Sequence, residues 1–190
     1  MKLTELQSKN PELYCTDKFG ASNKWVSHAY GEFYDEYFEK IKNKKLDVLE
    51  IGIYTGGSVR LFHDYLKNSN IYGVDIQDIW NAGDEYPFPR LQRRFFNAYD
   101  MGNWKKLPID KFDIIIDDGP HTYDSQLFAL NNFYSMLKPN GILIVEDVPT
   151  AFLTKLLTES IHKSNEYIVH NWESKTKVND DIIIAKIKTT

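Results

Sequence analysis

The chain has 190 residues, of which 42% are hydrophobic and 26% charged, enough for one domain with a substantial core. A formal net charge of −4 without a basic run gives no electrostatic basis for binding nucleic acid, and no apolar stretch reaches the roughly 20 residues of a membrane span. The single cysteine, Cys15, excludes an internal disulfide framework, and the first residues lack a signal-peptide core, so we expect a cytoplasmic protein with no nucleic-acid or membrane partner.

The first 45 residues are expected to form a helical lid or cap segment. Apolar side chains recur there at the spacing of one helix face, at Tyr30, Phe33, Tyr34, Tyr37, Phe38 and Ile41. Most such stripes pack against a core. An exposed part of this one is a candidate homo-oligomer surface or substrate wall. With residues 46–190 as the core, we treat 1–190 as a single domain.

From residue 46 onward, short apolar runs alternate with helical patterns. We expect strands at 46–53, 71–76, 91–96, 110–117 and 142–145, a helix over 152–161, and an antiparallel closing hairpin from 167–172 and 181–188. The turn residues LKPNG at 137–141 are expected to end a helix before the fifth strand. Alternation with short connections predicts an α/β, Rossmann-like, doubly wound sheet, mostly parallel and seven-stranded, with helices on both faces.

The loop after the first strand has the composition of a cofactor-binding loop. The sequence EIGIYTGGS at 50–58 places glycines where the backbone can approach a ligand, just before a helix N-terminus with unpaired N–H groups. Asp75, near the end of the second strand, is suited to accept from ribose hydroxyls. Both features fit a dinucleotide or S-adenosylmethionine. Tyr54 replaces a glycine of the dinucleotide pattern G-x-G-x-x-G, which favours S-adenosylmethionine; the alternative is that Gly56 and Gly57 only form a tight turn.

The run FDIIIDDGPH at 112–121 brings acidic side chains to the end of a buried strand, where ligands bind in open α/β sheets. Asp118 ends this strand, and Glu146 and Asp147 end the next. Neighbouring strands lie about 5 Å apart, so three carboxylates repel unless a cation lies between them. Oxygen ligands favour Mg²⁺, with Mn²⁺ possible. His121 is the candidate general base for a substrate hydroxyl; a competing interpretation makes it a metal ligand, which would admit Mn²⁺ or Fe²⁺.

Four segments, LEIGIYTGGS, YGVDI, FDIIIDDGPH and LKPNGILIVEDV, together resemble the class I S-adenosylmethionine-dependent methyltransferases. They are most similar to the metal-dependent antibiotic-sugar O-methyltransferases of the mycinamicin and macrocin type, over roughly residues 16–150. The resemblance implies methyl transfer to a hydroxyl of a small molecule, a sugar or other vicinal diol. It implies cofactor contacts from Glu50, Gly52, Tyr54, Gly56, Ser58, Asp75, Asn97, Ala98, Tyr99 and Asp117, metal ligation by Asp118, Glu146 and Asp147, and catalysis by His121.

Three residues depart from the family pattern, Asn97, Pro120 and Asn140. Asn97 stands where the family more often has an acid, so it bears on the adenine-side contacts. Asp117 points to the other side of its strand and serves either the cofactor pocket or the turn. Two alternatives stay open. A non-catalytic S-adenosylmethionine-binding module should have lost part of the acidic and histidine set, and a nicotinamide-dependent oxidoreductase has no need of three carboxylates.

Overall fold

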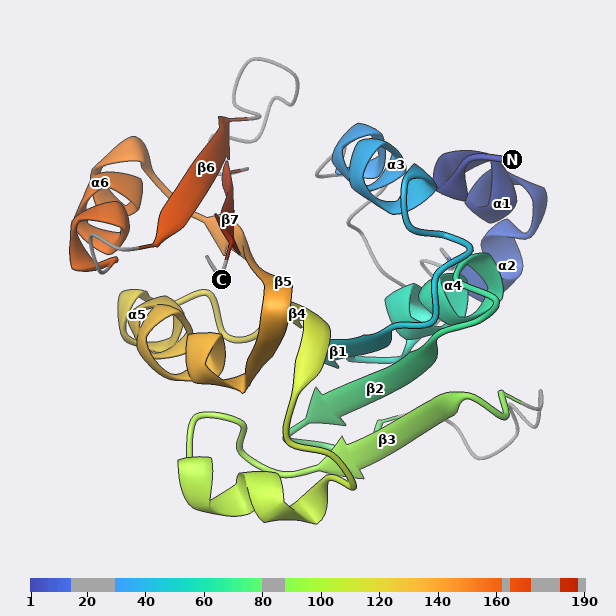
Figure 1. The fold of residues 1–190 in the computed structure, drawn as a ribbon, viewed down its shortest axis with the longest axis horizontal. Coiled ribbons are helices and arrows are strands. Elements are labelled where there is room, and N and C mark those ends of the chain that lie inside the picture. Colours follow the sequence, from blue (N-terminus) through green and yellow to red (C-terminus); the bar gives the residue numbers. More distant parts are fainter. Residues whose placement is uncertain (15–29, 80–87, 162–164, 172–181, 188–190) are drawn as a thin grey trace.

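The computed structural model describes residues 1–14, 30–79, 88–161, 165–171 and 182–187. They form one sheet with helices on both sides (Figure 1). In chain order the elements are α1 (Leu3–Lys9), α2 (Pro11–Tyr14), α3 (Gly31–Glu39), β1 (Asp47–Ile51), α4 (Gly57–Tyr65), β2 (Asn70–Asp75), β3 (Leu91–Phe95), η2 (Met101–Lys106), β4 (Phe112–Asp117), α5 (Tyr123–Asn132), η3 (Phe133–Met136), β5 (Leu137–Val148), α6 (Ala151–Ser160), β6 (Glu166–Asn171) and β7 (Ile182–Ile187).

The sheet has the order β3-β2-β1-β4-β5-β7-β6. The pairs from β3 to β5 are parallel, whereas β7 runs antiparallel to both β5 and β6. The central strand β4 is an apolar run because both its faces are covered: Ile114, Ile115 and Ile116 are all buried. The predicted α/β, Rossmann-like fold is confirmed.

Two hydrophobic clusters cover the two faces of the sheet. On one face the helices α1 to α4 pack against β1, β4 and β5, and on the other α5, η3, α6 and η2 pack against the same strands (Figure 1). The aromatic stripe of α3 belongs to the first cluster, where Tyr30, Phe33, Tyr34 and Phe38 are buried. These four side chains therefore pack against the core, as most such stripes do, whereas Tyr37 and Ile41 are only partly buried.

The boundary of β5 corrects one expectation. The helical segment of α5 and η3 does end where LKPNG begins, with Leu137 as its C-cap, but LKPNG is not a turn before the strand, because β5 already begins at Leu137 and pairs with Phe112. The pairing register then shifts before Ile114 meets Ile142, and Asn140 adopts a left-handed φ of 62° within this irregularity. Asn tolerates that conformation better than most residues, so the turn-forming sequence makes a bulge inside a strand.

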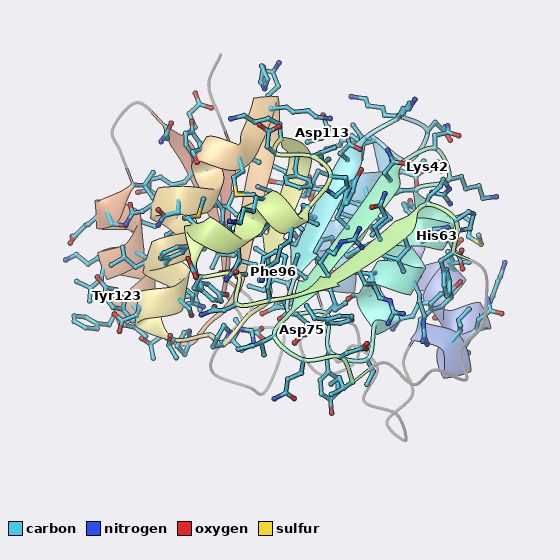
Figure 2. All side chains as sticks on the ribbon, turned by 90° about the horizontal axis from the view of Figure 1, so that it is seen from below. Lys42, His63, Asp75, Phe96, Asp113 and Tyr123 are labelled. Atoms are coloured by element: carbon cyan, nitrogen blue, oxygen red, sulfur yellow. The ribbon has the colours of Figure 1, made fainter. Side chains whose placement is uncertain are left out.

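The two ends of the strands have different roles. Asp75 and Phe96 lie near one edge of the sheet, and Asp113 lies at the opposite edge (Figure 2). At that opposite edge, Lys138 Nζ contacts Oδ2 of Asp47 at 2.6 Å and Oδ2 of Asp113 at 2.8 Å. These bonds raise the pKa of Lys138 despite the opposing effect of its burial. They link the amino-terminal parts of β1 and β4. This end of the sheet lies opposite the carboxyl ends of the strands, where ligands would bind. No helix within the described segments has the length and apolar character to cross a bilayer.

Candidate active site

A cleft of about 630 Å³ opens at the carboxyl ends of the parallel strands. That volume suits a small molecule or cofactor. It lies where the chain leaves β1 for one side of the sheet and β4 for the other, the position at which ligands bind in open α/β folds. Its walls are Ile51, Gly52, Ile53, Tyr54, Ser58, Val74, Asp75, Ile76, Phe96, Asn97, Ala98, Tyr99, Asp118, Gly119, Pro120, His121 and Asp147.

The loop after β1 is built around Gly52 and Tyr54. Gly52 has a φ of +83°, and its backbone N–H donates to the carbonyl of Val74 at 2.8 Å. Tyr54 also has a positive φ, of 46°, and its N–H donates to Oδ2 of Asp75 at 2.8 Å. The other oxygen of Asp75 accepts from the N–H of Gln77 at 3.1 Å. The Asp75 carboxylate is thus oriented by two backbone amides at the cleft wall.

The structure brings seven of the ten predicted cofactor residues to the cleft and places the other three, Glu50, Gly56 and Asp117, outside its lining. Glu50 is fully buried and accepts from the Ser58 hydroxyl at 2.6 Å. Gly56, with a φ of 85°, is the N-cap of α4. Asp117 is 2% exposed. Glu50 alternates along β1 with Ile51, which does line the cleft, so its side chain faces the other side of the sheet.

Asp117 instead anchors one wall of the cleft. The hydroxyl of Tyr99 donates to Oδ1 of Asp117 at 2.6 Å. Burial, with the Asp117 charge next, raises the pKa of Tyr99, so its hydroxyl stays protonated as a donor. A Cβ at Gly119 would lie 1.8 Å from the Tyr99 hydroxyl oxygen. Because residue 119 is a glycine and has no side chain, the Tyr99 hydroxyl fits next to it.

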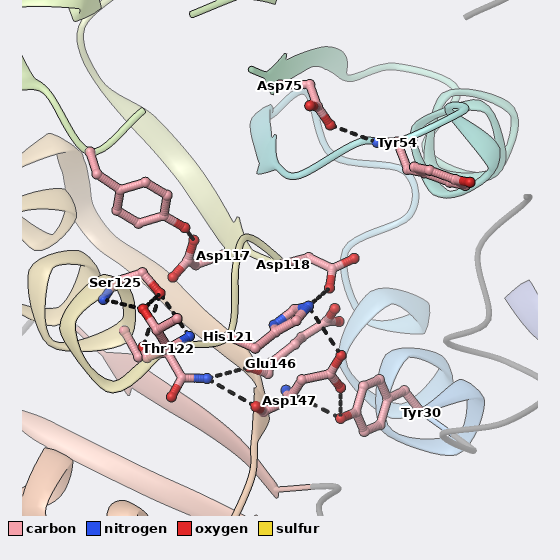
Figure 3. Close-up of polar contacts among 12 residues, drawn as sticks. Tyr30, Tyr54, Asp75, Asp117, Asp118, His121, Thr122, Ser125, Glu146 and Asp147 are labelled. Carbon is pink, nitrogen blue, oxygen red and sulfur yellow. Dashed lines mark hydrogen bonds and ion pairs between the residues drawn. The ribbon is translucent and has the colours of Figure 1, made fainter. Parts of the chain in front are cut away.

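His121 faces two carboxylates from different strand ends (Figure 3). Its Nε2 lies 3.7 Å from Oδ1 of Asp118 and 3.5 Å from Oδ2 of Asp147. One donor atom from each of the three side chains lies within 4.8 Å of the others, a grouping that could hold a metal ion. The sequence suggested Asp118, Glu146 and Asp147 as ligands, with His121 added to all three in the competing interpretation; the group contains two of these carboxylates, Asp118 and Asp147, together with His121.

Glu146 lies behind this group. Its side chain is fully buried and its carboxylate accepts from the hydroxyl of Tyr34. Burial first, and the Glu146 charge second, raise the pKa of Tyr34 well above its usual value, which keeps the phenol protonated. Glu146 thus contributes buried negative charge beside Asp147.

Backbone strain is concentrated at this cleft. Four described non-glycine residues have a positive φ, and three of them line the cleft: Tyr54, His121 with 55° and Asp147 with 52°. A left-handed conformation costs a residue with a side chain roughly 1–3 kcal/mol and persists where surrounding contacts hold it. After His121, Thr122 caps α5 by accepting from the N–H of Ser125 at 3.2 Å. The capped helix start fixes the turn that carries the histidine.

Two polar contacts of the site were not predicted from the sequence. The hydroxyl of Tyr30 reaches Asp147, and the side-chain amide of Gln126 reaches the backbone of Glu146 and Asp147. The sequence did signal Tyr30 and Tyr34 as members of the α3 stripe, without assigning either phenol a polar partner. Their spacing of one helical turn also allows two phenols to meet two consecutive carboxylates, and that pairing was the missed signal.

Comparison with known proteins identifies the class. Residues 49–148 match the family described as a methyltransferase domain, and the chain belongs to that family. It is 30% identical over 159 residues to the demethylmacrocin O-methyltransferase of Streptomyces fradiae, covering 79% of this chain and 37% of that protein. It is also 30% identical over 157 residues to the mycinamicin VI 2''-O-methyltransferase of Micromonospora griseorubida, with the same two coverages.

Solved structures agree with this assignment. The methyltransferase MycE of the mycinamycin pathway, in complex with Mg, SAH and mycinamycin VI, has a TM-score of 0.62 and 28% identity, and the match covers 77% of this chain and 37% of MycE. An O-methyltransferase from Bacillus cereus in complex with SAH has a TM-score of 0.65 at 17% identity, covering 98% and 90%, and shares the fold. The chain therefore spans a little over a third of the curated relatives above.

Proposed function

We propose that this chain is an S-adenosylmethionine-dependent, Mg²⁺-dependent O-methyltransferase that acts on a hydroxyl of a small molecule. The observation that carries the proposal is the position of His121 beside Asp118 and Asp147, in the same cleft as the glycine loop and Asp75. The methyltransferase family and the named activities of the relatives support it.

The cofactor half of the cleft extends from the β1 loop to the residues after β3. Gly52, Tyr54 and Ser58 would contact the methionine part of S-adenosylmethionine, with Ser58 near its carboxylate at the start of α4. Asp75 would accept from the ribose hydroxyls. The adenine would lie against a wall made of Ile76, Asn97, Ala98 and Tyr99.

The metal half fits a divalent cation by its donor set. Asp118 and Asp147 would hold the ion with oxygen atoms, His121 lies next to it, and the buried Glu146 adds negative charge. The MycE structure that resembles this chain contains Mg and SAH. A divalent cation at this position would lower the pKa of a nearby substrate hydroxyl.

His121 supplies the base. Its Nε2 faces the cleft between two carboxylates, and both stabilise the imidazolium that forms when it accepts the proton of the acceptor hydroxyl. The fixed loop and the capped turn after His121 would hold acceptor and cofactor in line, so the chain contributes mainly alignment and charge.

The acceptor we propose is a sugar or another vicinal diol, since relatives named for macrolide-sugar methylation match most of this chain. We further propose that the seven-stranded sheet with its antiparallel C-terminal pair acts as one catalytic domain, with residues 1–45 as a cap that meets the metal half at Tyr30. The contact of Tyr30 with Asp147 supports that location of the cap.

Calorimetry tests the proposal. The protein is titrated with S-adenosylhomocysteine and with NAD, each with and without Mg²⁺, and transfer of labelled methyl from S-adenosylmethionine is measured against a panel of glycosides that carry vicinal diols. We expect S-adenosylhomocysteine to bind, NAD not to bind, and transfer to stop in excess chelator. Absence of S-adenosylhomocysteine binding overturns the proposal, and full activity in chelator overturns its metal-dependent part.

A further inference from the structure

The backbone N–H, the backbone carbonyl and the carboxylate of Asp147 each make a polar contact. It is the second-last residue of β5, has a left-handed φ of 52°, and directs Oδ2 toward His121 at 3.5 Å (Figure 3). An aspartate in that conformation stays there because its neighbours fix it. The neighbours that do so come from two helices on opposite faces of the sheet, α3 and α5.

The first is Tyr30, at the start of α3. Its hydroxyl donates to Oδ1 of Asp147 at 2.5 Å and accepts from the backbone N–H of Asp147 at 3.3 Å. The side chain of Tyr30 is 1% exposed. Since Tyr30 takes Oδ1, it is Oδ2 that faces the histidine. The phenol of Tyr30 thereby determines that Oδ2, and not Oδ1, is the oxygen of Asp147 that points toward His121 and the proposed metal site.

The second is Gln126, within α5. Its Nε2 donates to the carbonyl oxygens of Glu146 and Asp147, each at 3.0 Å, and the residue is 1% exposed. One side-chain amide therefore spans two consecutive carbonyls across the strained residue. Together with Tyr30 it fixes the amide, the carbonyl and the carboxylate of Asp147.

We propose that Tyr30 and Gln126 are positioning residues that aim the carboxylate of Asp147 at the divalent cation, and that Tyr30 confines Asp147 to ligation through Oδ2. The proposal rests on the proposed function. Groups that hydrogen-bond to a metal ligand orient it and raise the affinity for the ion. The cap segment would thereby contribute to the metal site without supplying a ligand.

The test measures binding of Mn²⁺, whose electron paramagnetic resonance signal reports free ion, to the metal-free protein. Tyr30→Phe removes the phenol and keeps the ring in its buried place. Tyr65→Phe is the matched control, because the hydroxyl of Tyr65 donates to Oε2 of Glu39 at 2.8 Å and so links α4 to α3 away from the site. Gln126→Met, of similar length but unable to donate, tests the second contact.

We expect Tyr30→Phe and Gln126→Met each to raise the Kd for Mn²⁺ by about 10-fold to 100-fold. Tyr65→Phe should stay within about 2-fold of wild type, and all three variants should bind S-adenosylhomocysteine as wild type does. If wild type binds Mn²⁺ and both Tyr30→Phe and Gln126→Met bind it equally well, the positioning role is overturned while the proposed function stands. If wild type binds no Mn²⁺, the metal-dependent function itself fails.

Hydrogen exchange supplies a readout that needs no metal. The Asp147 amide donates to the Tyr30 hydroxyl, so Tyr30→Phe should speed exchange in a peptide covering residues 144–150 of the metal-free protein. Tyr65→Phe should leave that peptide unchanged. Unchanged exchange in Tyr30→Phe would contradict the contact on which the proposal depends, and would do so even if the variant bound metal poorly for another reason.

Discussion

The backbone of Gly52 lies so close to the backbone of Asp118 that no side chain fits between them. A Cβ at Gly52 would come within 1.9 Å of the Asp118 carbonyl oxygen. Next to this contact, the N–H of Asp118 donates to the carbonyl of Ile51 at 2.9 Å. The loop that would bind the cofactor and the turn that would carry the base are therefore one packed unit, and a displacement of either moves the other.

Gly52→Ala tests this coupling. The new methyl group would meet backbone atoms that cannot rotate away, at a φ of +83° that alanine resists, so we expect a loss of roughly 2–4 kcal/mol in the free energy of unfolding. S-adenosylhomocysteine binding should weaken as well. Urea unfolding and calorimetry measure the two effects.

Gly102→Ala is the control, since its Cβ would meet only the Asp100 Oδ1 atom, at 3.2 Å, which can move. We expect its free energy of unfolding to change by less than about 1 kcal/mol. Equal effects of the two substitutions would show that the contact between Gly52 and Asp118 carries no special constraint.

His121→Ala should separate chemistry from binding. Removing the imidazole takes away the proposed base but none of the cofactor walls, so the Kd for S-adenosylhomocysteine should change by less than about 2-fold while methyl transfer falls by about 100-fold or more. Radiolabelled methyl transfer measures the second quantity. His170→Gln is the control, because His170 lies on β6 and contacts Phe33 and Tyr37 rather than the cleft. Unchanged transfer in His121→Ala would exclude His121 as the base.

Some of this site was predictable because it depends on the period of strands and on where they end. Apolar runs that end in acid placed Asp75 and Asp118 at the carboxyl edge, and the turn residues after Asp118 placed His121 near them. Strand order then follows from short right-handed connections, so Asp147 could be expected beside Asp118.

Other features depend on contacts that local sequence does not encode. Glu146 was predicted as a ligand, but its hydrogen bond with Tyr34 of α3, which is far away in the chain, was not predicted. The bulge at Asn140 looks like a helix-ending turn until Leu137 pairs with Phe112. The helical turn η2, whose buried Trp104 donates from Nε1 to the carbonyl of Ala98 at 2.9 Å, has no periodic pattern that would reveal it.

Asp118→Asn tests whether the Asp118 carboxylate binds the proposed divalent cation. The amide keeps the size of the side chain but removes the charge that a hard cation needs, so Mn²⁺ binding should weaken by about 10-fold or more, with S-adenosylhomocysteine binding retained. Calorimetry measures both ligands on one sample. Asp124→Asn is the control, because Asp124 is an exposed carboxylate in the first turn of α5. Equal Mn²⁺ affinity in the two variants would place the cation elsewhere.

We expect His170 to make the free energy of unfolding depend on pH. It is half-buried against Phe33 and Tyr37, and this burial lowers its pKa, although the charge of Glu36 acts in the opposite direction. The folded protein therefore binds a proton at His170 less tightly than the unfolded chain does. Stability rises with pH where the unfolded state binds more protons, so the contribution of neutral His170 is present above the unfolded pKa of about 6.5 and is lost as pH falls below it.

The measurement compares the melting temperatures of wild type and His170→Gln between pH 7.5 and 5.5. Glutamine does not titrate, so its variant should lose less stability over this interval than wild type, and the melting temperature of wild type relative to that of the variant should fall as the pH falls. His63→Gln would not serve as a control, since His63 is buried and its Nδ1 bonds Asp64 Oδ1 at 2.8 Å. Parallel curves for wild type and His170→Gln would mean that the packing of α3 against β6 is indifferent to the charge of this imidazole.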